Sequence, residues 1–479
     1  MKCFKNSFQK IKLQKINLKN IQNVFLFSFY CDILFSGGAK MKDIYLTNYA
    51  VKGIKTLDQL ISLSFYRKII PRNPQTQEYN IKGIYGMNGS GKSGIIASVD
   101  ILKNLLTNPN YLNNPLVQKN LDAIINKKTN ELFMEATYLT ETGNNLFVFR
   151  YELTLAKDLI GKYIITSEQL SSRKACSQSS SMKPVFKVVN GEITFLQQDN
   201  SQELENFIYR KTTNLLTTNP LCTLFFEKIL SNKDVNFSTS ELFFNICTLY
   251  ILGNKIHVFI DQSDDHRKYF INNLLNYEDD PEKKTAPFND LIKHLLETDS
   301  DRLNIISVSE NVVPKNSYHL FEETIDKLYE FLRIFKADLL KIKIDRKEDA
   351  DVYVCNLIMV YESYQIHAEF ESTGIKKLIK LYAYLKEMVH GGIVFIDEFD
   401  SNLHDVYLCA LLEYLMQYGK GQLCFTTHNV GPMDILKQHK KSIDFLSLDH
   451  KIYPWTTNGH YSPSKLYLNG MIEGSPFNV

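Results

Sequence analysis

Residues 86–93 read GMNGSGKS and set glycines, a lysine and a serine at fixed spacing. They fit the pattern G-x-x-x-x-G-K-[ST], in which glycines let backbone N–H groups turn toward phosphate oxygens. In this chemistry Lys92 contacts the β- and γ-phosphates of a nucleoside triphosphate, and the Ser93 hydroxyl ligates Mg²⁺. The alternative is a strand-to-helix turn without a ligand. The residues assigned to phosphate binding are Gly86, Asn88, Gly89, Ser90, Gly91, Lys92 and Ser93.

The sequence around this loop predicts the elements that must hold it. A short apolar strand precedes the loop, and an amphipathic helix follows it with Ile95, Val99, Leu102 and Leu106 on one face. The N-terminus of that helix adds a partial positive charge where the phosphates bind. Strand, glycine loop and helix in this order favour the nucleotide interpretation.

Two adjacent carboxylates follow a second apolar run. Residues 393–396 read IVFI, as in a buried parallel strand, and lead directly into Asp397 and Glu398. Beside a phosphate loop, Asp397 would contact Mg²⁺ through water, and Glu398 would polarise the attacking water as a general base. The alternative is an acidic cap at the end of a strand.

Two further positions are predicted to reach the same site. His428 ends the next apolar strand, in CFTTHN, where its ring could contact the γ-phosphate or the attacking water. FESTGIKK places Ser372 and Gly374 before a long helix, and such an N-cap exposes backbone donors to an anion. A structural histidine and a plain helix cap are the alternatives. The residues assigned to the reaction itself are Lys92, Glu398 and His428.

Composition fits a globular chain of two lobes or a core with a large insertion, because 479 residues are long for one domain. The net charge of +2 divides into +6 over residues 1–40 and −4 over the rest. Outside residues 1–40 the chain has no overall positive charge of the kind that indicates nucleic-acid binding. The eight cysteines are scattered without a C-x-x-C pair, which argues against zinc clusters and disulfide frameworks and fits the reducing cytosol.

The leader, residues 1–40, is basic and then apolar, like a secretory signal. Its basic part is over-long and Asp32 interrupts the apolar run, which is too short to span a bilayer comfortably. We therefore expect an extension that is disordered or not native, no membrane partner and a cytoplasmic location. Met41 opens a more regular segment.

Beyond the leader, the sequence predicts an α/β head interrupted by a mainly helical insertion. We expect the first half of the head at 41–200, the helical lobe at 201–336 and the second half at 337–479. Three strand-like runs between 131 and 170 predict an antiparallel sheet, and the Ser-rich stretch 171–184 predicts a flexible loop. From 373 onward, helices and apolar strands alternate, as in a parallel α/β sheet.

The order of these motifs resembles a known family. GMNGSGKS, ESTG before a helix, IVFIDE and TTHN follow one another as in ABC-type ATPase heads of the RecF/SMC kind. The narrower resemblance is to OLD-like, AAA-type ATPases of bacterial anti-phage and abortive-infection systems. It rests on Asn88, the Asn48–Tyr49 pair and FDSNLH after Glu398, and it covers residues 41–170 and 340–479.

The resemblance implies a P-loop NTPase fold, ATP and Mg²⁺ as cofactors, and a head-to-tail homodimer with two shared sites. Ser372 and Gly374 of one subunit would face the phosphate loop of the other. ESTG departs from the family's LSGGQ, and Asp405 stands where a proline is more usual. Gln169 is a weak candidate for a Mg²⁺-contacting glutamine, and Tyr49 and Phe65 are candidates for adenine stacking.

Three functions fit these observations. The first is an ATP-driven switch in phage defence that controls a separately encoded nuclease or toxin. The second is a RecF-like DNA-repair ATPase, and the third is a nucleotide-gated scaffold with little hydrolysis. DQSDDH at 261–266 and the His404–Asp405 pair could bind metal, but an acidic turn and a helix-start contact are the simpler interpretations. Only about fifty residues follow His428, so we expect no nuclease domain of the toprim kind.

Overall fold

The computed structural model describes residues 44–142, 145–175, 181–198, 202–212, 214–230, 240–261, 268–269, 305–456 and 461–475. The predicted leader, most of the acidic turn at 261–266 and residues 270–304 of the predicted helical lobe lie outside these residues. In the part of the chain that is described, no helix is both long and apolar enough to cross a membrane.

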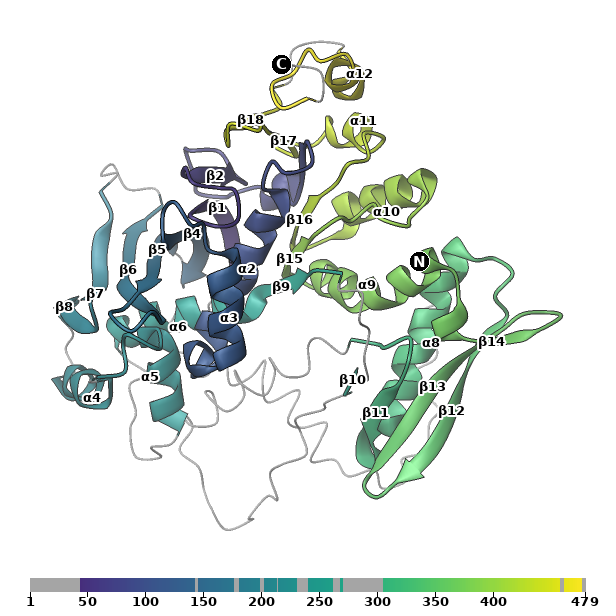
Figure 1. The fold of residues 1–479 in the computed structure, drawn as a ribbon, viewed down its shortest axis with the longest axis horizontal. Helices are drawn as coiled ribbons and strands as arrows, with labels where there is room; N and C mark the ends of the chain where they lie inside the picture. The colour runs from purple at the N-terminus through teal and green to yellow at the C-terminus, as the bar shows by residue number, and fades with distance from the viewer. Residues whose placement is uncertain are drawn as a thin grey trace.

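A six-stranded sheet forms the centre of the head (Figure 1). Five of its strands run parallel to one another, and the sixth, β18 (Ile452–Pro454) at one edge of the sheet, runs antiparallel to its neighbour. In sheet order they are β18, β17 (Ile443–Leu446), β3 (Ile81–Gly86), β16 (Gln422–Thr426), β15 (Ile393–Ile396) and β9 (Ile256–Phe259). β3, β15, β16 and β17 are buried along their whole length, as their apolar sequences predict. The sheet confirms the predicted α/β P-loop fold.

Helices cover both faces of this sheet. On one face α2 (Lys92–Thr107) and α6 (Glu241–Lys255) pack with Phe395 of β15 in one apolar core. On the other face α9 (Thr373–Val389), α10 (Asp405–Tyr418) and α11 (Met433–Leu436) pack with Val394 of the same strand. Successive side chains of a strand point to opposite faces, so one apolar strand supports both cores.

An antiparallel sheet of seven strands lies beside the central one (Figure 1). In sheet order its strands are β2 (Ile61–Ser64), β1 (Tyr45–Lys52), β4 (Glu131–Thr142), β5 (Asn145–Lys157), β6 (Tyr163–Lys174), β7 (Lys183–Val189) and β8 (Glu192–Leu196). The predicted antiparallel pairing of β4, β5 and β6 is confirmed. The Ser-rich loop is shorter than predicted, because strands extend to Lys174 and resume at Lys183, and residues 176–180 are not described.

The predicted helical lobe divides between two places. α4 (Gln202–Thr212), α5 (Leu221–Leu230) and α6 contribute to the same apolar core as the phosphate-loop helix, and β9 pairs with β15 in the central sheet. The described residues of these helices and of β9 therefore pack with the head. Helical spacing predicts a helix but not the surface against which its apolar face packs. The domain division as a whole stays a prediction.

A smaller lobe follows, in which α8 (Tyr318–Phe335) packs on a second sheet, whose strands pair antiparallel except for one short parallel pair (Figure 1). The strands are β10 (Lys268–Tyr269), β11 (Asn311–Pro314), β12 (Lys341–Asp349), β13 (Val352–Val360) and β14 (Gln365–His367). The remaining helices and 3₁₀ turns are η1 (Thr76–Tyr79), η2 (Tyr111–Asn113), α3 (Pro115–Ile124), η4 (Lys315–Ser317), η5 (Ala368–Phe370) and α12 (Pro463–Leu468).

Glu168 is a fully buried carboxyl group that joins α5 to the antiparallel sheet. The Tyr151 hydroxyl donates to it at 2.9 Å, and the backbone N–H of Leu221 donates at 3.0 Å. Burial raises its pKa from 4.5 to about 7, against the lowering effect of these two hydrogen bonds. Between these pH values the folded protein holds a proton that the unfolded chain has released, so the free energy of unfolding falls as pH rises.

We expect Glu168→Gln to remove this pH dependence. Relative to the unmodified protein, the variant should gain stability between pH 5 and pH 8, by about 3 kcal/mol at most. Melting temperatures measured across this range test the prediction, with Glu192→Gln on exposed β8 as the control. If the melting temperatures of Glu168→Gln and of the unmodified protein change with pH in the same way, the prediction is wrong.

Candidate nucleotide site

The phosphate loop runs from the end of β3 to the start of α2, and packing requires glycine at two of its positions. A Cβ atom on Gly86 would lie 2.4 Å from the carbonyl oxygen of Leu446 in β17. Gly91 has a φ of +106°, and its Cβ would lie 2.2 Å from Leu57 Cδ2. Larger residues would displace the loop from the sheet at one end and from the β1–β2 connection at the other.

Lys92 is buried and its ammonium group lies within the loop. Nζ donates to the carbonyl oxygens of Gly86 at 2.7 Å and Met87 at 3.0 Å. Burial lowers the Lys92 pKa to about 8, opposed by the charges of Asp397, Glu398 and Asp400. The loop lysine therefore lies within electrostatic reach of these carboxylates.

The other loop residues present a mixture of exposed and buried groups. Asn88 and Gly89 are exposed, whereas Ser90 is completely buried. Among the described residues, Ser90 Oγ has no hydrogen-bond partner. Ser93 lies half-buried in the first turn of α2. A buried hydroxyl without a partner is costly in a plain turn, so this loop suits a polar ligand.

Asp397 and Glu398 are held by a residue that sequence reasoning did not single out. The Thr426 hydroxyl donates to Asp397 Oδ1 at 2.5 Å and accepts from the backbone N–H of Glu398 at 2.8 Å. Asp397 is only 8% exposed, so this contact fixes the direction of a nearly buried carboxylate. TTHN contained the signal, because Thr426 lies two residues before His428 on the adjacent strand.

Glu398 adopts an unusual backbone conformation at the end of β15. Its φ is +49°, in the left-handed region that residues other than glycine seldom adopt. Its side chain is exposed, while its carbonyl oxygen accepts from the N–H of Ser401 at 3.0 Å. Such conformations persist only where the surroundings enforce them, and they gather at functional sites.

His428 follows β16 and lies at the same edge of the sheet. Its backbone N–H donates to Asp400 Oδ2 at 3.4 Å, and its ring is exposed. Partial burial and the neighbouring Lys92 ammonium lower its pKa, opposed by nearby Asp400 and Glu398. The ring is therefore neutral at pH 7, and one nitrogen can accept a hydrogen bond while the other donates.

Ser372 and Gly374 lie at the start of α9, against the turn that follows Glu398. Ser372 caps the helix by accepting from the N–H of Ile375 at 3.4 Å, and its side chain is exposed. A Cβ atom on Gly374 would lie 2.6 Å from the carbonyl oxygen of Asn402. Thr373, Glu398 and Asn402 together line a cavity of about 490 Å³. None of the hydrogen bonds found among the described residues links Ser372 or Gly374 to the phosphate loop of the same chain.

Three secondary candidates lie elsewhere. Tyr49 is in the core and donates to Ser98 Oγ at 2.8 Å, while Phe65 packs edge-on against Phe395. Neither ring is available for adenine stacking, so those two assignments are wrong. Gln169 lies in β6, and its amide donates to Ser171 Oγ at 3.0 Å.

The His404–Asp405 pair has the simpler role that was anticipated. His404 Nδ1 accepts from the N–H of Val406 at 3.3 Å and caps α10. Asp405 Oδ1 accepts from Asn429 Nδ2 at 2.6 Å. Both contacts fix the start of α10.

The connection between β1 and β2 supports the phosphate loop and was missed at the level of sequence. Thr56 Oγ1 donates to the carbonyl oxygen of Gly89 at 3.3 Å, and Leu57 packs against Gly91. Lys55 and Thr56 are exposed beside the loop.

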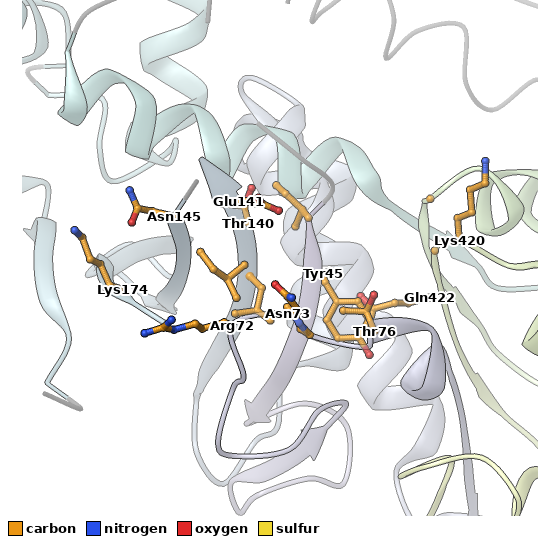
Figure 2. A pocket seen from close by; sticks show the side chains of 16 residues that line it. Tyr45, Arg72, Asn73, Thr76, Thr140, Glu141, Asn145, Lys174, Lys420 and Gln422 are labelled. Atoms are coloured by element: carbon orange, nitrogen blue, oxygen red, sulfur yellow. The ribbon is translucent and has the colours of Figure 1, made fainter. Parts of the chain in front are cut away.

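A larger cavity, of about 890 Å³, lies away from the phosphate loop. It opens between the antiparallel sheet and the amino ends of β15 and β16, where Gly391 and Gly421 line it. Figure 2 shows Arg72 and Lys174 on one side and Lys420 on the other. All three side chains are exposed, and Glu141 is the one carboxylate in the lining.

Part of the chain matches a known family. Residues 259–434 match the family described as "AAA domain, putative AbiEii toxin, Type IV TA system". This stretch is similar to an AAA ATPase domain. It contains Ser372, Gly374, Asp397, Glu398 and His428, and it begins after the phosphate loop. The match covers little over a third of the chain, and it supports nucleotide binding and ATPase function.

No curated protein matches the chain. A structure of the recombination mediator protein RecF-ATPrS in the RecFOR pathway is 13% identical, with a TM-score of 0.37, over 87% of this chain and 99% of its own. A structure of the SmcHead bound to the C-winged helix domain of ScpA is 12% identical, with a TM-score of 0.37, over 86% of this chain and 98% of its own. At these values neither similarity carries an argument about function.

The oxygen groups beside the phosphate loop fit Mg²⁺. A serine hydroxyl at the start of α2 and the oriented carboxylate of Asp397 are hard ligands of the kind that this ion prefers. Mg²⁺ commonly takes one or two protein ligands and fills its other positions with water and phosphate oxygens. The described residues hold no group of three or more His, Cys, Asp or Glu side chains that could enclose a metal.

We expect Thr426→Val to lower the affinity of the site for Mg²⁺. The valine keeps the shape of the threonine but loses the hydrogen bonds to Asp397 and to the Glu398 backbone. Residues that orient metal ligands typically change metal affinity by about 10- to 100-fold. The Mg²⁺ concentration needed for half-maximal ATP turnover should rise by at least about tenfold.

Thr223→Val provides the matched control, because Thr223 is also buried and donates to two carbonyl oxygens, those of Leu105 and Leu106, away from the site. An unchanged Mg²⁺ requirement in Thr426→Val would show that this threonine does not position the carboxylate.

Proposed function

We propose that this chain hydrolyses ATP with Mg²⁺ and acts as a homodimeric, ATP-driven switch. The observation that carries the proposal is the order of three adjacent strands in the central sheet. β3 leads to the phosphate loop, β16 to His428, and β15 to Asp397 and Glu398. Carboxyl ends of parallel strands meet at one edge of a sheet, so these groups surround one position. The pKa of Lys92 responds to both carboxylates.

Each residue has a defined task in this proposal. The backbone N–H groups of residues 88–93 bind the phosphates, and Lys92 exchanges its contacts with Gly86 and Met87 for the β- and γ-phosphate oxygens. Bound near Ser93 and Asp397, Mg²⁺ would neutralise negative charge on the phosphoryl oxygens.

Glu398 accepts a proton from the attacking water. The water oxygen then bonds to the γ-phosphorus as the bond to the bridging oxygen breaks, which releases ADP and phosphate. Neutral His428 donates a hydrogen bond to a γ-phosphate oxygen through its ring N–H.

A second copy of the chain would complete each site. Ser372 is exposed at the N-terminus of a 17-residue helix, where backbone N–H groups and the helix dipole attract anions. Within its own chain this loop packs on the turn after Glu398 rather than on the phosphate loop. A head-to-tail dimer would bring Ser372 and Gly374 to the partner's γ-phosphate.

Release of phosphate from ATP by the purified protein tests the enzymatic part of the proposal. We expect turnover that needs Mg²⁺ and stops when EDTA removes it, since only two protein oxygens are proposed to hold the ion. ATP binding without phosphate release at any Mg²⁺ concentration would favour the nucleotide-gated scaffold instead.

The biological setting that we propose is phage defence from the cytoplasm, with control of a separately encoded effector such as a nuclease or toxin. The description of the matched family, which names an AbiEii toxin of a type IV TA system, supports this setting. Neighbouring genes for a nuclease or toxin, and protection from phage that is lost in Glu398→Gln, would bear it out. Protection that does not need Glu398 would separate the defence role from ATP hydrolysis.

DNA binding in the manner of a repair ATPase is the second candidate. The larger cavity favours it, because Arg72 and Lys174 line one side and Lys420 lines the other side of an opening that could accept a phosphodiester chain (Figure 2). Fluorescence anisotropy with labelled DNA, with and without ATP and over a range of salt, tests this candidate. DNA binding is favoured if the affinity for DNA falls steeply as the salt concentration rises, and if this fall is less steep in an Arg72→Gln/Lys420→Gln variant.

A further inference from the structure

The turn after β15 is held from two sides. On one side Thr426 of β16 contacts Asp397 and the backbone N–H of Glu398. On the other side Lys377 of α9 donates to the carbonyl oxygen of Glu398 at 2.5 Å and to the hydroxyl of Ser401. The peptide units on both sides of the Glu398 Cα are therefore fixed, at a residue whose φ is +49°.

Lys377 is buried to an extent that is unusual for a lysine. Its exposed fraction is 2%, and burial lowers its pKa, opposed by the charges of Asp261, Asp400 and Glu398. A buried ammonium is costly unless it is paired and hydrogen-bonded, and here its two hydrogen bonds both go to the turn that follows the strand. The neighbouring Lys376 is half-buried and donates to the carbonyl oxygen of Glu369, outside the turn.

The same helix touches this turn at a second point. At its N-terminus, Gly374 approaches the carbonyl oxygen of Asn402 so closely that a Cβ atom would lie 2.6 Å away. One helical turn separates Gly374 from Lys377, so the Ser372–Gly374 loop and the Glu398–Asn402 turn are joined by two contacts along one rigid segment. Displacement of the loop must be transmitted to the turn.

We propose that Lys377 is a positioning residue that holds Glu398 in its strained conformation and couples it to the Ser372–Gly374 loop of the same chain. The inference rests on the proposed function, in which that loop meets the nucleotide of the partner subunit. Nucleotide bound in one site of the dimer then sets the position of Glu398 in the other. Hydrolysis at the two sites is therefore cooperative, and Lys377 is the connection.

The test compares Lys377→Met with Lys376→Met, because methionine keeps an unbranched side chain and removes the ammonium group, with its charge and its hydrogen bonds. In Lys377→Met we expect kcat to fall by about 10- to 100-fold, as for a misplaced catalytic group, while KM and the affinity for ATP stay within about threefold. The Hill coefficient of ATP turnover should fall toward 1. Lys377→Arg, which restores a donor, should recover part of kcat, and Lys376→Met should behave like the unmodified protein.

Two results would overturn the role of Lys377. One is a kcat and Hill coefficient in Lys377→Met equal to those of Lys376→Met. The other is a joint loss of melting temperature, ATP affinity and kcat that Lys377→Arg does not relieve, since this describes a residue needed only for folding. Failure of the proposed function looks different: the unmodified protein then shows no Mg²⁺-dependent turnover, whatever residue stands at 377.

Discussion

Replacement of Glu398 by glutamine is expected to lower ATP turnover by about 10²- to 10⁴-fold, the usual contribution of a general base. Glutamine has nearly the same size and preserves the backbone contacts to Thr426, Lys377 and Ser401, but its amide cannot take a proton from water. ATP binding should remain, because the phosphate loop is untouched. The variant should therefore accumulate as an ATP-bound dimer.

Phosphate release and light scattering after size exclusion measure the two parts of this result. Glu413→Gln, on the exposed side of α10, is the matched control and should retain normal turnover. Unchanged turnover in Glu398→Gln would remove Glu398 from the reaction. If the variant loses turnover but stays monomeric at all ATP concentrations, the role of Glu398 as general base still holds, but the proposed ATP-bound dimer is wrong.

Replacement of Lys92 by alanine is expected to abolish ATP binding at concentrations that saturate the unmodified protein. Hydrogen bonds to charged groups contribute about 1.5–3 kcal/mol each, so loss of the contacts to the β- and γ-phosphates should weaken binding by about 100-fold or more. In the nucleotide-free protein the change also leaves the carbonyl oxygens of Gly86 and Met87 without the donor that they now share.

Titration calorimetry with ATP measures this effect directly. Lys103→Ala is the control, because Lys103 lies on the same helix three turns beyond the phosphate loop. The lowered Lys92 pKa of about 8 adds a pH dependence: ATP affinity should fall as pH rises from 7 to 9 and the ammonium loses its proton. Normal affinity in Lys92→Ala would show that the nucleotide does not bind in this loop.

The sequence predicted best those elements whose signal is local. The long helix expected after Ser372 begins at Thr373 and ends at Val389, because Ser372 caps it and the sequence changes at Gly391–Gly392. The apolar run before Asp397 correctly predicted a buried strand. In both cases a stretch of fewer than twenty residues contains the physical cause of the structure.

Elements that depend on distant partners were not predictable in this way. β9 is four residues long and follows directly on α6, and only its pairing with β15, far along the chain, makes it a strand of the central sheet. Tyr49 and Phe65 have the right chemistry for base stacking, but the packing of β1 and β2 on Phe395 buries both rings. Thr426 and Lys377 gain their roles from hydrogen bonds across 28 and 21 residues.

The strand order of the central sheet also bears on how the protein is made. β3 carries the phosphate loop from near the start of the chain, yet its neighbours on both sides, β16 and β17, end at Thr426 and Leu446. Gly86 itself is fitted against Leu446. A chain emerging from the ribosome therefore carries its phosphate loop without flanking strands until residue 446 has been added. We expect a polypeptide cut short before residue 446 to bind no nucleotide, because the strands that flank the loop are then incomplete.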